Sequence, residues 1–475
     1  MARRRSYEMD LTSGNLWSQI IAYSLPLMLT SFLQLMYNAA DNIVVGRFAE
    51  DGEAALAAVS STGSLINLIV NLFIGLSVGT SIVVARYRGA GRQWDVSQTV
   101  HTSMTVSILF GIILLIVGVA FAEPLLKLMD SPDNVRGLAA LYVRIYFAGM
   151  PFNMAYNFAA AVLRAVGDTR RPMYILVFSG LINVLFNLFF VIALHMDVAG
   201  VALATIISQA ISAVLVVFCL IKSEGDIHLD LRKLRINKEK LLELAKCGMP
   251  AGLQGILFSF SNVMIQSSIN EYGKAVMAGN GAASNLEGFV YATMNTLYQA
   301  CLAFTGQNHG ARNYKRIRKT LGICLIYVFV IGLVLGSLVR LFGEDLLAIY
   351  RPDREPEVIN AGLTRLSVVC ATYFLCGIMD VLCGSLRGMG KTIMPMFVSL
   401  AGACGLRVIW ILTIYKIMHT LAWLYASYPV SWAITALVHF ICFLAVCRSM
   451  QKDGEFEPLS LSRKNAALFS HIKRL

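Results

Sequence analysis

The chain has 475 residues, of which 57% are hydrophobic and only 14% are charged, and its mean hydropathy is +0.65. A soluble protein of this length would carry nearer a quarter charged residues, so a soluble globular domain is excluded. The net charge of +12 alternates between short segments rather than forming one basic face, which excludes a nucleic-acid-binding protein.

Apolar runs long enough to cross about 30 Å of hydrocarbon recur from one end of the chain to the other. We therefore expect an all-α integral membrane protein with twelve transmembrane helices and no soluble domain of useful size. The predicted spans are 17–42, 56–84, 97–121, 137–162, 173–195, 199–221, 243–269, 278–304, 318–341, 361–384, 394–417 and 421–447.

The first span carries polar residues at three- and four-residue intervals, which places them on one helix face. These residues are Thr30, Gln34, Tyr37, Asn38 and Asp41. A carboxylate in a bilayer costs at least a few kcal/mol, so Asp41 should face a protein interior or a watery cavity. We interpret it as a proton, cation or substrate site; the alternative is an aspartate that reaches the membrane interface. Pro26 lies inside the span and should bend the helix.

Basic residues alternate with the predicted topology. If the N-terminus lies inside, 29 of the 40 Lys and Arg residues fall on cytoplasmic segments and 8 on external ones. The positive-inside rule then predicts that both termini are cytoplasmic. A long basic connection separates six spans from six, which gives an N-lobe, a cytoplasmic linker, a C-lobe and a cytoplasmic tail at 1–221, 222–240, 241–448 and 449–475.

The second half of the sequence echoes the first. Pro250 follows Pro26 by 224 positions, and two further pairs of segments are offset by 221 and 223 positions. These pairs are Gly89-Ala90-Gly91-Arg92 with Gly310-Ala311-Arg312-Asn313, and Leu163 to Met173 with Leu386 to Met396. Because six is an even number, the copies have the same orientation. The pattern predicts two parallel six-helix repeats (lobes), a transporter architecture, with Pro26 and Pro250 as hinges.

Two further acids lie in predicted spans. Glu287 shares a face with Tyr291 and Asn295, and an acid among aromatic rings suits an organic cation. The alternative is a structural acid that pairs with an arginine elsewhere. For Asp380 the two interpretations stay open, because Arg387 lies two turns further along the same face and could pair with it.

The segment Ser385 to Thr392 resembles a phosphate-binding loop, but Ser385 replaces the first glycine and a membrane helix precedes it, so we exclude ATP binding. No nucleophile–base pair or metal-ligand cluster occurs in the loops, so we expect no enzyme, no metal and no cofactor. The energy should come from an ion gradient, with H+ or Na+ as the coupling ion.

Several stretches spread over nearly the whole chain resemble the multidrug and toxic compound extrusion (MATE) family, nearest its bacterial DinF/MepA-type branch. They are Ser24 to Leu29, Tyr37 to Gly46, Ala54 to Val59, Leu163 to Pro172, Gly200 to Thr205, Gly306-Gln307-Asn308 and Leu386 to Thr392. Each motif is weak alone, but together and in this order they are specific.

The resemblance implies two six-helix lobes around a V-shaped cavity, with outward export driven by inward H+ or Na+. It implies that Asp41 is the coupling residue, with polar partners at Asn157, Asn183, Asn187 and Thr205. Some relatives have a second acid at the position of Asn187. Another branch uses a glutamate where Phe258 stands here, so that branch's coupling scheme does not carry over.

We therefore expect a secondary active multidrug efflux antiporter that exports organic, mostly cationic, compounds in exchange for H+ or Na+. The polar stripes assign substrate binding to Gln34, Tyr37, Asn38, Glu287, Tyr291 and Asn295. One alternative is a flippase for lipid-linked saccharides, whose cavity should contain Arg or Lys; another is a channel or receptor without ion coupling. We expect a multi-pass monomer of the cell membrane whose partners are small organic cations or drugs and the lipid bilayer, not nucleic acid.

Overall fold

The structure is a computed structural model that describes residues 7–48, 52–128, 133–350 and 355–452. These residues are nearly all helical, and no strand occurs among them. The first half contains α1 (Leu16–Phe48), α2 (Gly52–Gly89), α3 (Gln93–Leu128), α4 (Asp133–Ala148), α5 (Met150–Ala165), α6 (Arg170–Leu188), η1 (Phe189–Ala193) and α7 (Asp197–Lys222).

A connection that contains one 3-10 turn, η2 (Leu231–Lys233), leads to the second half. This half contains α8 (Lys238–Asn270), α9 (Lys274–Gly310), α10 (Tyr314–Leu341), α11 (Gly343–Tyr350), α12 (Pro356–Val368), η3 (Cys370–Thr372), α13 (Tyr373–Gly388), α14 (Ile393–Ser399), η4 (Leu400–Gly405), α15 (Leu406–Trp410), η5 (Ile411–Tyr415), α16 (Lys416–Met418) and α17 (Leu421–Lys452).

Nine helical segments of the described chain are long and apolar enough to cross a membrane, which makes this a multi-pass membrane protein. The other three predicted spans correspond to α4–α5, α8 and α9. The α4–α5 pair is two short helices, whereas α8 and α9 are long but less apolar. Helices that face a protein interior need less apolar surface than lipid-facing ones. The number twelve stays a prediction.

Four predicted spans are not single α-helices. One of them, 173–195, continues from α6 into the π-helical turn η1. The predicted span 137–162 is divided at Gly149, where Pro151 lies in the first turn of α5 and cannot donate a backbone hydrogen bond to the preceding turn. The predicted span 361–384 is divided by η3, and Thr372 Oγ1 donates to the carbonyls of Val368 and Val369 there. The predicted span 394–417 contains two π-helical turns. Hydropathy alone does not locate such breaks.

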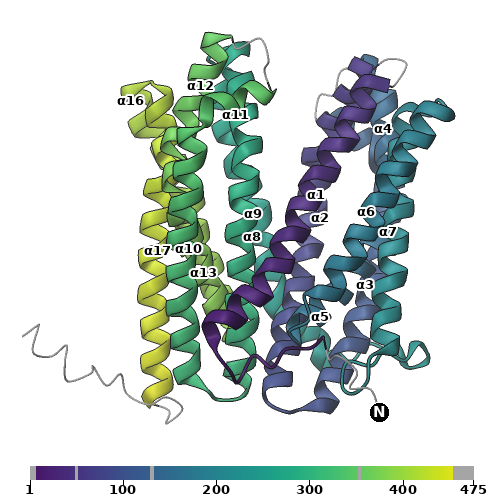
Figure 1. Cartoon of the computed structure of the whole chain (residues 1–475), viewed down its shortest axis with the longest axis vertical. Helices are drawn as coiled ribbons and strands as arrows, with labels where there is room; N and C mark the ends of the chain where they lie inside the picture. The colour runs from purple at the N-terminus through teal and green to yellow at the C-terminus, as the bar shows by residue number, and fades with distance from the viewer. Residues whose placement is uncertain (1–6, 49–51, 129–132, 351–354, 453–475) are drawn as a thin grey trace, which may run out of the picture.

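Each half has its own large hydrophobic cluster. One gathers mainly buried residues of α2–α7, together with a few from the nearby ends of α8 and α9, and the other gathers buried residues of α8–α10, α12, α13 and α17. Helix α1 joins both, because Ile20 and Tyr23 belong to the second cluster and Val45 belongs to the first. Figure 1 shows α1–α7 grouped on one side and α8–α17 on the other, with ribbons that diverge toward the upper end.

The two halves touch most closely where α2 meets α8. A Cβ atom at Gly75 would overlap the backbone of Gly252, and one at Gly79 would overlap the backbone of Gly248. Only glycine fits such a contact, as in other membrane helix pairs that carry small residues four positions apart. We call this contact the glycine seam.

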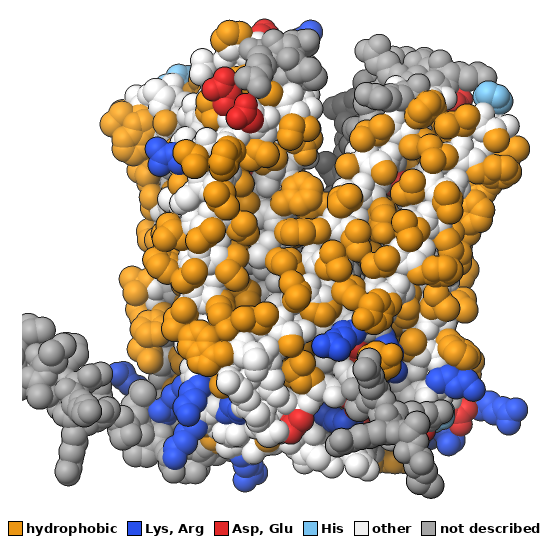
Figure 2. Space-filling view, in the orientation of Figure 1, with side chains coloured by type: hydrophobic (Ala, Val, Ile, Leu, Met, Phe, Trp, Pro, Cys, Tyr) orange, Lys and Arg blue, Asp and Glu red, His pale blue; other side chains and the backbone are white. Residues whose placement is uncertain are grey.

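Basic side chains gather at the end where α1 begins and α17 ends. In Figure 2 an apolar band covers the middle of this face, and most visible Lys and Arg side chains lie at the lower end. The connection between α7 and α8 is at this end too, because Asp226 pairs with Arg88 and the Asp230 amide donates to His101. The connection spans residues 223–237 rather than the predicted 222–240, and α17 extends beyond the predicted end of the C-lobe, to Lys452.

The segment before α1 also lies at this end and connects the two halves. Its Glu8 pairs with Arg88 of α2, while its Leu11 is fully buried in the hydrophobic cluster of the second half. Arg316 of α10 donates to the backbone carbonyls of Leu11, Ser13 and Gly14. The N-terminal segment therefore holds α2 and α10 together at this end.

Candidate functional site

A cavity of about 550 Å³ lies between the helices of the first half and α9. This volume is in the range of sites that hold small organic molecules. Its lining is mostly polar or aromatic and comprises Ser31, Gln34, Leu35, Tyr37, Asn38, Asp41, Tyr146, Asn153, Tyr156, Asn157, Leu176, Ser179, Gly180, Asn183, Thr205, Ser208, Gln209, Ser212, Gly288, Tyr291, Ala292 and Asn295.

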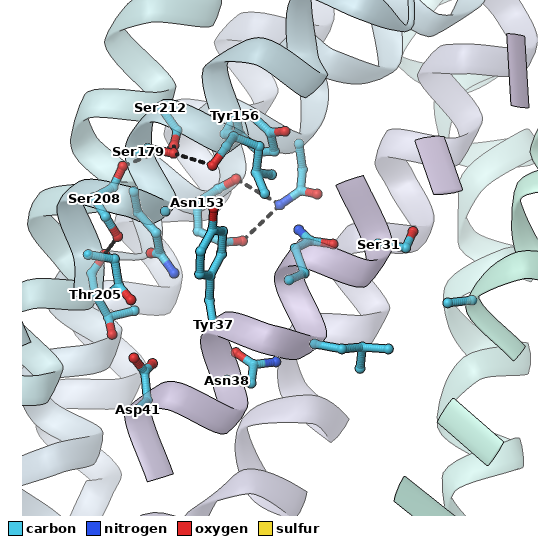
Figure 3. A pocket seen from close by; sticks show the side chains of 18 of the residues that line it. Ser31, Tyr37, Asn38, Asp41, Asn153, Tyr156, Ser179, Thr205, Ser208 and Ser212 are labelled. Carbon is cyan, nitrogen blue, oxygen red and sulfur yellow. Dashed lines mark hydrogen bonds between the residues drawn. The ribbon is translucent and has the colours of Figure 1, made fainter. Parts of the chain in front are cut away.

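Helix α1 contributes one wall of this cavity. Gln34, Tyr37, Asn38 and Asp41 all line it, which is the arrangement that their helical spacing predicts. In Figure 3 Tyr37 and Asp41 extend from α1 toward the helices that carry Thr205 and Ser208. The Tyr37 hydroxyl donates to the carbonyl of Val177 at 3.3 Å, so this ring is fixed against α6.

Gly180 makes room for the Tyr37 ring. A Cβ atom at Gly180 would overlap the ring carbons of Tyr37. The close approach of α1 to α6 at the cavity therefore depends on a residue without a side chain.

Asp41 accepts a hydrogen bond from Nδ2 of Asn187. The same amide nitrogen lies 3.3 Å from Oδ1 of Asn183. Asn187 is fully buried, and its own Oδ1 has no hydrogen-bond partner in the described part of the chain. Among the residues that the structure describes, no Lys, Arg or His forms an ion pair with Asp41. The result is a carboxylate and a free amide oxygen next to each other without a cation.

The other predicted coupling residues lie around the same cavity. Asn157 donates from Nδ2 to the backbone carbonyl and to Oδ1 of Asn153, both at 2.9 Å. Thr205 donates to the carbonyl of Val201 at 2.9 Å. The cavity is lined by Asn157, Asn183 and Thr205. Asn187 does not line it, but it donates to Asp41, which does.

A row of hydroxyl groups lines the wall opposite α1. Ser212 donates to Ser179 at 2.6 Å and to the carbonyl of Ser208 at 2.9 Å, as Figure 3 shows for the first of these bonds. Ser208 and Ser212 lie four residues apart, a spacing that places them on one helix face, but none of the three serines was among the predicted site residues. Tyr146, which also lines the cavity, had no sequence signal, because it lies on the short helix α4.

The second half faces the cavity through α9. Tyr291 and Asn295 line it, as their shared face predicts. Glu287 does not: it is 5% exposed, and its carboxylate accepts two hydrogen bonds from Arg365, each 2.7 Å long. The prediction that Glu287 faces a substrate cavity is therefore wrong. The partner lies on another helix, 78 positions along the chain, so helix periodicity could not reveal it.

Arg365 is held by more than Glu287. Its Nη1 donates to Oδ1 of Asn280 at 2.5 Å, and the Tyr425 hydroxyl donates to the same oxygen at 3.2 Å. The guanidinium also lies over the rings of Tyr425 and Tyr428. This closed network satisfies a buried charge pair inside the second half.

Asp380 and Arg387 do not pair directly. Arg387 donates to the Tyr298 hydroxyl and to Oε1 of Gln254, both at 2.7 Å. Asp380 is half-buried, and it does not line the 550 Å³ cavity. The predicted hinge prolines, Pro26 and Pro250, are both buried inside uninterrupted helices.

A second cavity, of about 290 Å³, adjoins the first and shares Ser31, Gln34, Tyr156, Asn157 and Asn295 with it. It extends toward the end of α5, where Arg164 lines it. Neither Lys nor Arg is among the residues that line the first cavity. Arg164 is the exception in the second.

A family model described as MatE matches the chain twice, over residues 26–191 and 250–413, which together exceed half of its length. The chain belongs to the MatE family. This result confirms the resemblance that the sequence motifs indicate. The two matches begin at Pro26 and Pro250, in agreement with the internal repeat of the MatE chain.

Named relatives and a solved structure agree with the family. The chain is 28% identical over 446 residues to the probable multidrug resistance protein YoeA of Bacillus subtilis (strain 168), covering 92% of this chain and 95% of that protein. It is 24% identical over 395 residues to the multidrug export protein MepA of Staphylococcus aureus (strain NCTC 8325 / PS 47), covering 82% and 86%.

Among solved structures, the outward-facing conformation of a multidrug resistance MATE family transporter of the MOP superfamily aligns with a TM-score of 0.86 at 21% identity. The alignment covers 93% of this chain and 98% of that one, so the two share a fold. Together these matches place the MatE chain in a multidrug efflux transporter family.

Proposed function

We propose that this MatE protein is a secondary active antiporter that exports organic, mostly cationic, compounds in exchange for H+ or Na+, without a further cofactor and without enzymatic activity. The observation that carries the proposal is Asp41, a carboxylate with no cationic partner among the described residues, in the wall of a cavity of about 550 Å³. An acid placed in this way binds a cation or a proton in preference to staying charged and unpaired.

The coupling ion binds at Asp41 and its amide neighbours in this proposal. The free Oδ1 of buried Asn187 supplies an acceptor beside the carboxylate, and Asn183 supplies a second amide oxygen nearby. A protonated Asp41 could donate to such an oxygen, and a sodium ion could be bound by the same oxygens. Asn157 and Thr205, in the same cavity wall, complete the coupling set.

The substrate occupies the main cavity in this proposal. Gln34, Tyr37, Asn38, Tyr291 and Asn295 offer hydrogen bonds and ring faces around Asp41. Aromatic rings attract organic cations through their quadrupole, which favours cationic drugs as the substrate class. The flippase alternative gains no support from this cavity, because neither Lys nor Arg is among its lining residues.

The architecture that supports antiport is two parallel six-helix lobes, at 1–221 and 241–448, in a multi-pass monomer of the cell membrane. The two hydrophobic clusters, the twice-matched family model and the repeat offsets support two lobes. The basic end supports cytoplasmic termini, a cytoplasmic linker and a cytoplasmic tail. Pro26 and Pro250 act as hinges, because each removes one backbone hydrogen bond from its helix.

An ion can drive export only if it binds one conformation better than another. Neutralising Asp41 removes a charge from the cavity wall and changes its hydrogen bond with Asn187. We propose that this change alters the bend of α1 between Pro26 and Asp41. The cation that the charged Asp41 had attracted is then released. Proton or sodium entry and substrate exit then alternate at one site.

Asp41→Asn tests the proposal, because the amide mimics the neutral state permanently. In proteoliposomes with an imposed H+ or Na+ gradient, we expect the variant to fold, to bind a cationic dye more weakly than wild type and to lose gradient-driven transport. Asn38→Asp/Asp41→Asn, which moves the acid by three positions, about one helical turn along α1, is the matched control for net charge and should not restore transport. Wild-type rates in Asp41→Asn at equal protein abundance would refute the coupling role.

A further inference from the structure

The second cavity contains a cationic side chain that has no partner among the described residues. Arg164 lines this cavity from the end of α5, and its guanidinium makes no hydrogen bond or ion pair with any residue that the structure describes. None of the residues that line the cavity is an aspartate or a glutamate. A guanidinium has five N–H donors and is always charged, so it needs acceptors from water or from a ligand.

The internal repeat shows how the same arginine is satisfied in the other half. The repeat offset of 223 relates Arg164 to Arg387. Arg387 is 6% exposed and donates to the Tyr298 hydroxyl and to Oε1 of Gln254, both at 2.7 Å. In the second half this position is therefore a closed structural cluster.

Both partners of Arg387 have been replaced by shorter side chains in the first half. The repeat offsets relate Gln254 to Thr30 and Tyr298 to Ser77. Thr30 donates to the carbonyl of Pro26 at 2.8 Å, and Ser77 donates to that of Ile74 at 2.7 Å, so each hydroxyl group bonds to its own helix. Thr30, Ser77 and Arg164 all line the 290 Å³ cavity. The space that Gln254 and Tyr298 fill in one half is open in the other.

We infer that Arg164 binds an anionic group of the transported compound, a carboxylate in particular, and that the substrates include zwitterions. The inference rests on the proposed transport function. The two cavities share five lining residues, so one molecule can place its carboxylate near Arg164 and its cationic part beside the Tyr156 ring and the amides of the shared lining. A guanidinium matches a carboxylate through two parallel hydrogen bonds, which gives it selectivity for this group.

A pair of dyes that differ in one methyl group tests this assignment. Tetramethylrhodamine is a zwitterion with a free carboxylate, and its methyl ester is a cation of nearly the same shape. Binding of each dye to purified protein is measured by fluorescence anisotropy for wild type, Arg164→Gln, Arg170→Gln and Thr30→Gln. Arg170 is exposed at the start of α6 and lines neither cavity, so it is the matched control for charge.

We expect Arg164→Gln to raise the dissociation constant of the acid by about tenfold or more, since hydrogen bonds to charged groups are among the strong ones. The dissociation constant of the ester should change by about twofold at most in Arg164→Gln. Arg170→Gln should change the dissociation constant of neither dye. Thr30→Gln leaves the charge of Arg164 in place but gives it a glutamine oxygen to bond to, as Gln254 does for Arg387. This variant should therefore also weaken binding of the acid. This variant keeps the test decisive if Arg164→Gln fails to fold.

Equal effects of Arg164→Gln on acid and ester, or no effect on either, would overturn the inference. The inference would also be overturned if the wild-type protein bound the acid no more tightly than Arg164→Gln does. Gradient-driven transport of the ester in proteoliposomes reports the antiport function separately. Loss of that transport with the selective binding intact would reject antiport and still support Arg164 as the carboxylate site.

Discussion

Arg365 donates two hydrogen bonds to the carboxylate of Glu287, from Nε to Oε1 and from Nη2 to Oε2, each 2.7 Å long. Both side chains are buried, so removing either one leaves an uncompensated charge. We expect Glu287→Gln to destabilise the protein by about 3–5 kcal/mol, seen as a lower thermal midpoint in detergent. Glu287→Leu/Arg365→Met should recover most of the loss. An unchanged midpoint with a raised substrate constant would instead return Glu287 to a binding role.

Gly180 should be needed for substrate binding. Gly180→Ala places a Cβ atom where the Tyr37 ring now lies, and such overlap costs about 1–3 kcal/mol. We expect weaker binding of a cationic dye with little loss of folded protein. Gly288→Ala is the matched control, because a Cβ there meets only Leu35 Cδ2 at 4.0 Å on the other side of the same cavity. Equal binding by the two variants would contradict the role of Gly180.

The glycine seam should tolerate no side chain. Gly79→Ala and Gly252→Ala each place a Cβ atom in the backbone of the opposite helix, and we expect each to lower stability by about 1–3 kcal/mol and to reduce the monodisperse yield. Gly255→Ala lies one turn further along α8, where a Cβ meets only Asn71 Cβ at 3.6 Å. If all three variants behave alike in size-exclusion chromatography and thermal unfolding, the seam does not hold the halves together.

The topology should follow the basic residues. In a cysteine-free version, His195→Cys lies in the exposed connection between η1 and α7, and Lys233→Cys lies in η2. An impermeant maleimide added to intact cells should label position 195 only, with position 233 labelled after the membrane is permeabilised. The reverse pattern would place the termini outside.

Sequence periodicity predicted the α1 wall of the cavity well, because the spacing of Gln34, Tyr37 and Asp41 on one helix fixes their common face. It failed for Glu287, since a buried acid looks the same in sequence whether it faces a ligand or an arginine on a distant helix. The contact of Asn187 with Asp41 was expected only through the family resemblance, because it joins two spans 146 positions apart.

The helix breaks illustrate a second limit of sequence patterns. Pro151 marks the division between α4 and α5, but no proline lies in the helical turn before the π-helical turns η1 and η5. The open space at Arg164 could be found only by comparing the structures of the two repeats. The sequence repeat pairs Arg164 with Arg387, and only three-dimensional contacts reveal that one is bonded and the other is not.

The glycine seam also restricts how the two halves can move. At this contact two backbones meet directly, so no rotamer change can absorb a displacement. If α2 slid along α8, Cα atoms of one helix would collide with carbonyl groups of the other. If one helix instead rolled on the other about their line of contact, the two backbones would not collide. The α2–α8 line is thus the axis about which relative rotation of the halves is sterically cheapest.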